Sequence, residues 1–200
     1  MLKFNFDEAL VEQGFHVIDN FLDDNYFQAL RTFCLSLEDD NQFKAAKVGN
    51  QVESQEAFHI RNDKICWLDS YQENQAVAFY LTQLSAIASQ LNQSLFLGIA
   101  EIEAHFAVYQ PASFYKKHVD QFKNTNSRRI STVFYLNSEW QDDFGGELKL
   151  YNQNDELIKI LSPKPNRFIC FNSELPHEVA TTKKVRYSIA GWLKSRNSPF

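Results

Sequence analysis

The pattern of apolar and polar positions changes near residue 100, and after that point it predicts a series of short strands. From Ile102 onward, apolar runs alternate with turn residues, giving EIEAHFAVY, FYKKHVD, RISTVFYLN, GELKLYN, ELIKIL, RFICFN, HEVA and VRYSIAGWLK. Eight strands within about 90 residues are the spacing typical of an antiparallel sandwich or jelly roll. Such a fold has an open mouth at one end, and FYKKHVD ends there.

The first hundred residues combine amphipathic helices with a few short strands. We expect helices from Asp7 to Gln13, from Asp23 or Asp24 to about Glu38, and from Asn74 to Asn92, an early strand within FHVIDNFL, a surface loop or loose hairpin from Asp39 to Glu56, and a strand within FHIRNDKICWLD. The third helix carries Val77, Leu81 and Leu84 at helical spacing. Its simplest role is to buttress the sheet that follows.

The strand pattern predicts a mainly β fold with flanking helices, and length and composition favour a single domain. The 200 residues contain 44% hydrophobic and 22% charged residues, which is ordinary for a soluble globular protein. We expect a single domain over 1–200, with a supporting region at 1–100 and a jelly-roll core at 101–195. The 18 phenylalanines suggest a core or a cavity with aromatic walls.

Charge and cysteine usage exclude several classes of function. The net charge of −5 gives no general attraction for nucleic acid, so we expect no nucleic-acid partner. No apolar run is long enough to span a membrane, and the first residues show no secretory signal, so we expect no membrane partner. Cys34, Cys66 and Cys170 are widely spaced and form no CxxC pair. Reduced thiols in the cytoplasm fit this pattern best.

The residues with the clearest chemical meaning are His118 and Asp120. They lie two positions apart in a predicted strand, so both side chains point to the same face. An imidazole and a carboxylate on one face form two thirds of the 2-His-1-carboxylate triad that holds non-haem Fe(II). The alternative is that two polar residues at this spacing mark the solvated face of the strand.

A triad needs a second histidine, and His177 is the only one downstream. It lies at the start of a strand, 177 − 120 = 57 positions beyond Asp120. A rolled sheet can bring strands that far apart in sequence together, so the triad is geometrically reasonable. His16, His59 and His105 have no partner at ligand spacing, and we expect them to be structural.

Arg186 lies inside the otherwise apolar strand VRYSIAGW. An unpaired buried guanidinium is costly, so an inward-facing Arg186 would need an anion, and a carboxylate that accepts two hydrogen bonds is its natural partner. The alternative is an outward-facing arginine on the solvated side of the strand.

Taken in order, HVD, RRISTVFYLN, FGGELKLY, PHEV and VRYSIAGW resemble the prolyl 4-hydroxylase branch of the Fe(II)/2-oxoglutarate-dependent dioxygenases. Within that branch they are most similar to the hypoxia-inducible-factor prolyl hydroxylases and their bacterial counterparts. The resemblance covers about Phe58 to Leu193, because IRNDKICWLD also resembles a segment of that subgroup. It implies a double-stranded β-helix, or jelly roll, supported by N-terminal α-helices.

The resemblance also implies roles for individual residues. His118, Asp120 and His177 would be the iron ligands. Arg186 would pair with the distal carboxylate of 2-oxoglutarate, and Tyr135 would hydrogen-bond the same group.

Four further positions match residues that shape the pocket of the family. Tyr109 would line the cosubstrate pocket, and Leu148 would supply an apolar wall beside it. Trp192 matches an aromatic near the mouth, and Arg128 matches an arginine associated with the peptide substrate. Residues 121–127, QFKNTNS, depart from the family because they lack the proline and glycines that follow HVD in the animal enzymes.

The implied activity is hydroxylation of a prolyl residue in a protein or peptide substrate, with Fe(II), 2-oxoglutarate and O2, and with ascorbate as a further candidate. The products would include succinate and CO2. Two alternatives remain, namely a hydroxylase of a free amino acid or other small molecule, and a non-catalytic jelly-roll binding module. A basic group of Lys116, Lys117, Arg128 and Arg129 could grip an acidic partner, although charge clusters are usually solvated faces.

Overall fold

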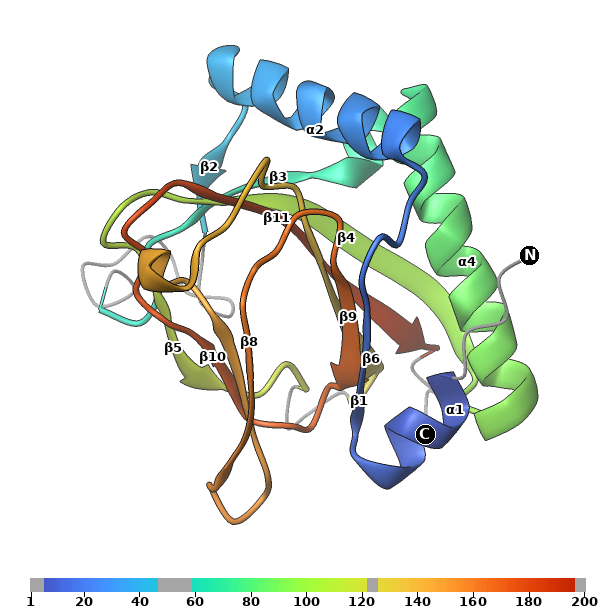
Figure 1. Cartoon of the computed structure of the whole chain (residues 1–200). Coiled ribbons are helices and arrows are strands. Elements are labelled where there is room, and N and C mark those ends of the chain that lie inside the picture. The colour runs from blue at the N-terminus through green and yellow to red at the C-terminus, as the bar shows by residue number, and fades with distance from the viewer. Residues whose placement is uncertain (1–5, 47–58, 122–125, 197–200) are drawn as a thin grey trace.

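The computed structural model describes residues 6–46, 59–121 and 126–196 (Figure 1). Within these ranges the strands form two antiparallel sheets, one of seven strands and one of four. In spatial order the larger sheet contains β1 (Phe15–Ile18), β9 (Phe168–Asn172), β6 (Arg128–Tyr135), β11 (Arg186–Ser195), β4 (Ile99–Tyr109), β3 (Lys64–Trp67) and β2 (Lys44–Ala45). The smaller sheet contains β5 (Tyr115–His118), β10 (His177–Val179), β7 (Leu148–Tyr151) and β8 (Leu157–Leu161).

The eight strands predicted after residue 101 are all present as β4 to β11, and the jelly-roll prediction is confirmed. β4 and β11 form the longest pairing, which runs from Arg186 opposite Tyr109 to Lys194 opposite Glu101 before its register shifts. β11 also pairs with β6. Arg186 therefore lies at one end of the central strand β11, and Trp192 lies near its other end.

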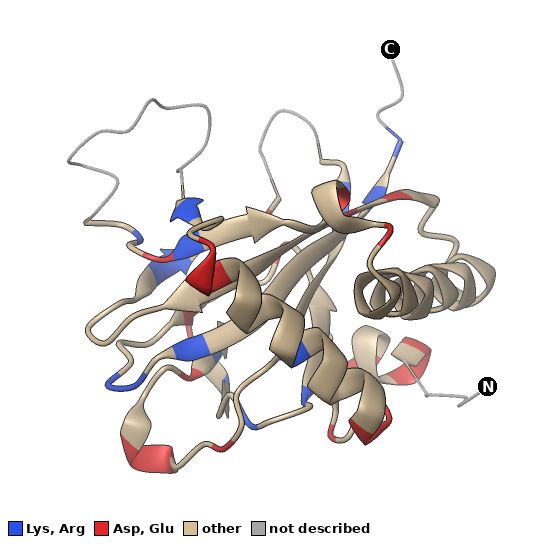
Figure 2. Ribbon diagram, turned by 90° about the horizontal axis from the view of Figure 1, so that it is seen from above, with Lys and Arg blue, Asp and Glu red and all other residues tan. Residues whose placement is uncertain are grey.

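Helices cover one face of the larger sheet, as Figure 1 shows for α2 and α4. The helices are α1 (Phe6–Glu12), α2 (Asp24–Asp39) and α4 (Gln75–Leu95), with short 3-10 turns at Leu68–Tyr71 and Asp142–Phe144. The α4 helix contains no charged residue, so it is drawn without charge colour along its length in Figure 2. An uncharged helix with one buried face is suited to pack on the sheet, as predicted.

Two side chains fix the ends of α4. At its start, the Asn74 side chain accepts hydrogen bonds from the backbone N–H groups of Ala76 and Val77. Near its end, the Asn92 side chain bonds both the N–H and the C=O of Ile99, which ties the last turn to β4. The helix continues three residues beyond the predicted end at Asn92, because this contact supports another turn.

Some predicted boundaries were wrong. The early strand, predicted with Phe15, Val17 and Phe21 as its apolar positions, ends at Ile18. Within the predicted loop or hairpin from Asp39 to Glu56, Lys44–Ala45 form β2 and pair with β3, while positions 47–56 lie outside the described residues. The strand predicted over Phe114–Asp120 forms only at Tyr115–His118.

The main apolar core lies between the helices and the larger sheet. Tyr80 of α4 stacks on Phe134 of β6, and Phe134 also contacts Phe21 and Phe27 edge to face. Aromatic pairs of this kind add to the stabilisation that burial provides. Many phenylalanines thus serve this core, whereas, within the described ranges, Phe171 is the phenylalanine that lines the cavity between the two sheets.

No helix among the described residues is long and apolar enough to cross a membrane.

Candidate metal centre

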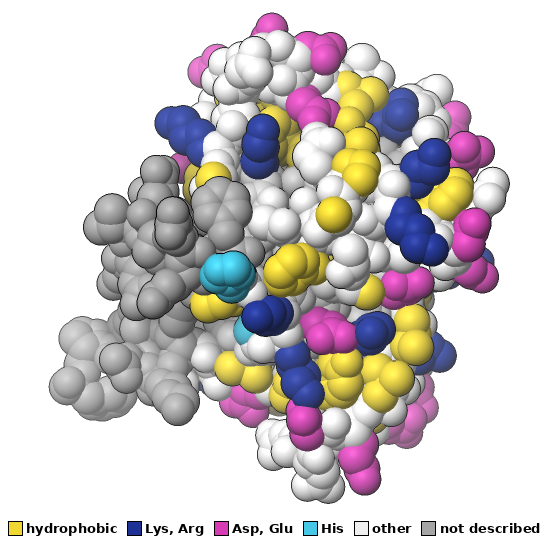
Figure 3. All heavy atoms as spheres, turned by 90° about the vertical axis from the view of Figure 1, so that its left-hand side faces the viewer, with side chains coloured by type: hydrophobic (Ala, Val, Ile, Leu, Met, Phe, Trp, Pro, Cys, Tyr) yellow, Lys and Arg dark blue, Asp and Glu magenta, His cyan; other side chains and the backbone are white. Residues whose placement is uncertain are grey.

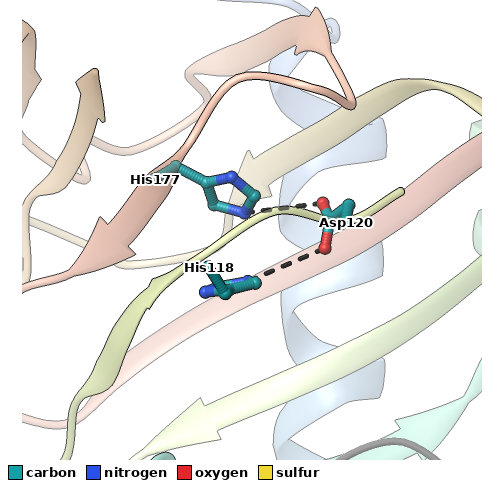
Figure 4. A group of neighbouring side chains, drawn as sticks. All are labelled: His118, Asp120 and His177. Atoms are coloured by element: carbon teal, nitrogen blue, oxygen red, sulfur yellow. Dashed lines mark ion pairs between the residues drawn. The ribbon is translucent and has the colours of Figure 1, made fainter. Parts of the chain in front are cut away.

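Three side chains predicted to be metal ligands converge at the end of the cavity between the sheets (Figure 4). His118 ends β5 and His177 begins β10, and the two residues are direct partners in the antiparallel pairing. The Nε2 atom of His118 lies 3.7 Å from one Asp120 carboxylate oxygen, and that of His177 lies 3.5 Å from the other. All three ligand atoms lie within 4.8 Å of one another. This spacing suits a single ion between them.

Asp120 reaches this position without being part of a strand, contrary to the prediction. β5 ends at His118, and the backbone N–H groups of Asp120 and Gln121 both donate to the carbonyl of Ser173. The Ser131 hydroxyl donates to one Asp120 carboxylate oxygen at 2.6 Å, and Ser131 in turn contacts the Ser173 hydroxyl at 2.9 Å. Two serines therefore orient the carboxylate.

Hydrogen bonds fix the same tautomer in both histidines. His118 Nδ1 lies 2.7 Å from the Lys116 carbonyl, and His177 Nδ1 lies 2.9 Å from the Leu175 carbonyl. A carbonyl can only accept, so each Nδ1 carries the proton and each Nε2 keeps its lone pair directed toward Asp120. Both imidazoles are thereby prepared to bind a metal through Nε2.

Burial and charge also favour the ligating forms. Burial, together with the neighbouring His177, lowers the pKa of His118 to about 3, so this imidazole is neutral at ordinary pH. Burial by itself would raise the pKa of Asp120, but His177, His118 and the Ser131 hydrogen bond lower that pKa below its usual range. A neutral imidazole and an ionised carboxylate are the forms that bind a divalent metal.

Arg186 faces inward and is 1% exposed. Its Nε donates to the Gly146 carbonyl at 3.0 Å, and its Nη1 donates to the Ser188 hydroxyl at 3.1 Å. Within the described ranges, no acidic side chain forms an ion pair with Arg186. A buried guanidinium with only neutral partners leaves a positive charge that an anionic ligand would compensate.

The surroundings of Arg186 suit a ligand carboxylate. The guanidinium carbon lies 4.8 Å from the ring centres of both Tyr109 and Tyr135. The Tyr135 hydroxyl is buried and has no hydrogen-bond partner among the described residues. Such a group usually serves a ligand or an ordered water. Gly146 leaves room here, because a Cβ on this residue would lie 3.1 Å from Arg186 Cδ.

The remaining predicted residues lie in or beside the same cavity. Tyr109, Leu148 and Trp192 line it. Arg128 stacks on Trp192, with its guanidinium carbon 3.6 Å from the ring centre. Arg128 Nη1 also donates to the backbone carbonyl of Asp120 at 3.3 Å.

Sequence reasoning missed several residues of the site. Arg61, Tyr115 and His105 line the cavity, although His105 was expected to be only structural. Its ring packs against Trp67 and Trp192, and its Nδ1 has no hydrogen-bond partner among the described residues. The one signal available in the sequence was the pair of opposite charges Arg61 and Asp63, two positions apart. This pair did not indicate a contact with the segment of His118.

Three of the four basic residues that the sequence places in one group each have a separate local partner. Lys117 binds Asp155 at 2.6 Å, and Arg128 lies 3.6 Å from Glu103. Arg129 donates to the Ser195 hydroxyl. Figure 3 shows basic, acidic and apolar side chains interspersed on the face that it presents. This mixed surface is typical of a solvated face.

A jelly roll with two histidines, a carboxylate and a buried arginine at one cavity is typical of the 2-oxoglutarate-dependent oxygenases of non-haem iron, and the chain belongs to the 2OG-Fe(II) oxygenase superfamily. The sequence profile of that superfamily matches residues 104–194. The relatives described next are all prolyl hydroxylases.

The structure is similar to a prolyl-4-hydroxylase from Pseudomonas putida, with 31% identity, a TM-score of 0.84 and coverage of 94% of this chain and 96% of that one. It is also similar to a prolyl hydroxylase from Trichoplax adhaerens solved with a peptide fragment of the hypoxia inducible factor oxygen degradation domain. That match has 26% identity, a TM-score of 0.84 and coverage of 94% and 86%.

The hypoxia-inducible factor prolyl hydroxylase of Caenorhabditis elegans is 25% identical over 201 residues, which cover 94% of this chain. The match spans only 28% of the length of that relative.

Proposed function

We propose that this protein is an Fe(II)- and 2-oxoglutarate-dependent dioxygenase that hydroxylates a prolyl residue in a protein substrate. The observation that carries the proposal is the convergence of His118, Asp120 and His177 in one cavity with a buried arginine that has no acidic partner among the described residues. The prolyl hydroxylases among its relatives support the substrate class, and the Trichoplax relative was solved with a peptide.

The metal would be held by three groups that are already oriented. His118 and His177 would bind through Nε2, because each Nδ1 donates to a backbone carbonyl. Asp120 would contribute a carboxylate oxygen while Ser131 holds the other one. A triad of this composition leaves coordination positions for a cosubstrate and dioxygen.

The cosubstrate would be held at its distal carboxylate by Arg186 and Tyr135. Arg186 supplies the charge, and the buried Tyr135 hydroxyl supplies a donor. Leu148 and Tyr109 would form walls of the same pocket. A carboxylate held at the far end of the cavity orients the molecule along it, so the other end faces the histidines.

When bound, iron and 2-oxoglutarate together supply the oxidation of a substrate C–H bond by dioxygen, with release of succinate and CO2. The chain itself positions the reactants and limits side reactions. Apolar side chains of Phe171, Leu148 and Val179 line the cavity and restrict water.

The substrate would enter near Trp192 of β11 and Arg128 of β6. Arg128 is opposite Lys194 of β11, so both residues lie toward the end of β11 that is away from Arg186. Arg128 is fixed over the Trp192 ring and bonds the Asp120 backbone. A planar cation over an aromatic ring presents donors that suit the carbonyl groups of a peptide.

The experiment uses purified protein with Fe(II), 2-oxoglutarate, O2 and ascorbate as a reductant. Proteins from cells that lack this gene serve as substrates. We expect succinate to form and specific prolyl residues to gain the mass of one oxygen atom by mass spectrometry. The same prolines should carry oxygen in wild-type cells. Succinate formation with free amino acids, and with no protein, would support the small-molecule alternative and overturn the proposal.

We also propose that the protein works in the cytoplasm. Cys34, Cys66 and Cys170 are all buried and unbonded to one another, as expected in a reducing compartment. Fractionation of cells that express the tagged chain tests this location, and recovery outside the cytoplasm would contradict it.

A further inference from the structure

Four side chains form a continuous column that ends on the His118 imidazole. Asp63 binds Arg61, Arg61 covers one face of Tyr115, and Tyr115 stacks on His118. We infer that Arg61 and Tyr115 are positioning residues that hold His118 in the orientation required for metal binding. The inference rests on the proposed function, because it concerns the same metal centre.

The contact between Tyr115 and His118 is close and nearly parallel. The ring centres are 3.6 Å apart, and the planes differ by 15°. Residues three apart in a regular strand point to opposite faces and cannot stack in this way. The pairing of β5 with β10 explains the exception, since the positions from Tyr115 to His118 oppose only those from His177 to Val179. This β-bulge turns both rings to one side, as bulges beside functional sites often do.

Arg61 closes the opposite face of Tyr115. Its guanidinium carbon lies 4.3 Å from the Tyr115 ring centre. Two hydrogen bonds of 2.7 and 2.6 Å from Arg61 to Asp63 fix the guanidinium plane. The Asp63 side chain is fully buried. A buried pair with two parallel hydrogen bonds keeps a specific geometry, which an exposed pair seldom does.

The backbone fixes the column to the ligand strand. Arg61 forms a β-bridge with Tyr115, and the Lys116 N–H donates to the Ile60 carbonyl at 2.9 Å. Lys116 is also the residue whose carbonyl accepts from His118 Nδ1. One segment therefore supports both the ring that covers His118 and the carbonyl that sets its tautomer.

This arrangement limits how the His118 ring can turn. Tyr115 covers one face, and the His177 ring lies 4.2 Å away at 55°. The Lys116 carbonyl holds Nδ1. Without the Tyr115 ring, rotation about the bond to the imidazole would move Nε2 away from Asp120. Loss of groups that orient a metal ligand typically weakens metal binding by about 10- to 100-fold.

A purely structural role for the column predicts a different result. If the four side chains only fasten β5 to the segment before β3, their loss would lower stability. Folded protein would still bind metal with unchanged affinity. Metal affinity and thermal stability must therefore be measured separately on the same variants.

The experiment measures Co(II) binding to the metal-free full chain, without 2-oxoglutarate, by calorimetry and by the visible spectrum of the bound ion. The variants are Tyr115→Leu, Tyr115→Phe and Arg61→Lys. Asp155→Asn is the matched control, because it removes the exposed ion pair of the adjacent strand residue Lys117. Thermal unfolding is recorded for each variant.

We expect Tyr115→Leu to weaken Co(II) binding by about 10-fold or more and to change the spectrum. Tyr115→Phe keeps the ring and should bind like wild type, as should Asp155→Asn. Arg61→Lys keeps the charge but loses the planar stack, and it should weaken binding by a smaller factor. If Tyr115→Leu does not fold, the Arg61→Lys result decides.

Unchanged affinity and spectrum in folded Tyr115→Leu, or in Arg61→Lys where that variant decides, would overturn the positioning role. A further variant, His118→Ala, distinguishes failure of the proposed metal centre from failure of the positioning role. If the metal centre is wrong, His118→Ala binds Co(II) as tightly as wild type, or wild type does not bind Co(II) at all.

Discussion

His177 and His118 are direct partners across the antiparallel pair of β10 and β5, and the Nε2 atoms of both face the Asp120 carboxylate. Replacing either histidine removes one of three converging ligands. We expect His177→Ala to abolish turnover. It should also weaken Co(II) binding by more than about 100-fold, the upper end of the effect of losing a residue that only orients a ligand.

Calorimetry on metal-free protein measures the loss at His177. His59→Ala serves as the control, because His59 is exposed and does not belong to the cluster. Full activity of His177→Ala would refute the iron assignment.

Arg186 leads to a separate prediction, because the hydrogen-bond partners of its buried charge in the described part of the chain are neutral. Arg186→Met keeps much of the volume and removes the charge. We expect the 2-oxoglutarate requirement to rise by about 30-fold or more, which corresponds to about 2 kcal/mol lost when one partner of a buried charged pair is truncated. Without cosubstrate, the free energy of unfolding should not fall, since an uncompensated charge is removed.

Steady-state kinetics at varied 2-oxoglutarate and urea unfolding of ligand-free protein provide the two measurements for Arg186. Arg167→Met is the control, as Arg167 pairs with Asp19 away from the cavity. An unchanged 2-oxoglutarate requirement would contradict the assignment of Arg186.

Much of this architecture could be predicted from the sequence, because the strands after residue 101 are short, apolar and separated by turn residues. The same pattern brought the segments of His118 and His177 into consideration. The position of Asp120 could not be predicted correctly. Strand periodicity suggested the right face, but the Ser173 carbonyl and the Ser131 hydroxyl hold it after the strand has ended.

The stack of Tyr115 on His118 was also hidden from the sequence. It depends on a bulge in the pairing with β10, and residues three apart give no signal of contact in a strand. Arg61 reaches the same place through an ion pair and a bridge to β5. Interactions that depend on register between distant strands are not encoded in local spacing.

Ser131 offers a test of how Asp120 is oriented. Ser131→Ala removes the 2.6 Å hydrogen bond to the carboxylate and leaves the ligand itself in place. We expect Co(II) affinity to fall by about 10-fold, the lower end of the effect of losing a group that orients a ligand. Ser85→Ala, on the exposed face of α4, should have no effect. Equal affinities of both variants for Co(II) would show that the Ser131 hydroxyl is dispensable.

His105 predicts how stability depends on pH. Burial lowers its pKa to about 3 in the folded chain, against an unfolded value of 6.5. Below pH 6.5 the unfolded chain therefore binds a proton that the folded chain does not, so the free energy of unfolding falls as pH decreases toward 3. Between pH 6.5 and pH 5, this one group should lower the free energy of unfolding by about 2 kcal/mol.

His105→Phe should remove that part of the pH dependence. The substitution also changes packing against Trp67 and Trp192, but this effect is the same at both pH values. The informative quantity is therefore the difference between the free energies of unfolding at pH 7 and pH 5, measured by urea titration. We expect this difference to shrink by about 2 kcal/mol in His105→Phe and to stay unchanged in His59→Phe. A difference as large as that of wild type would mean that His105 is protonated in the folded protein at pH 5.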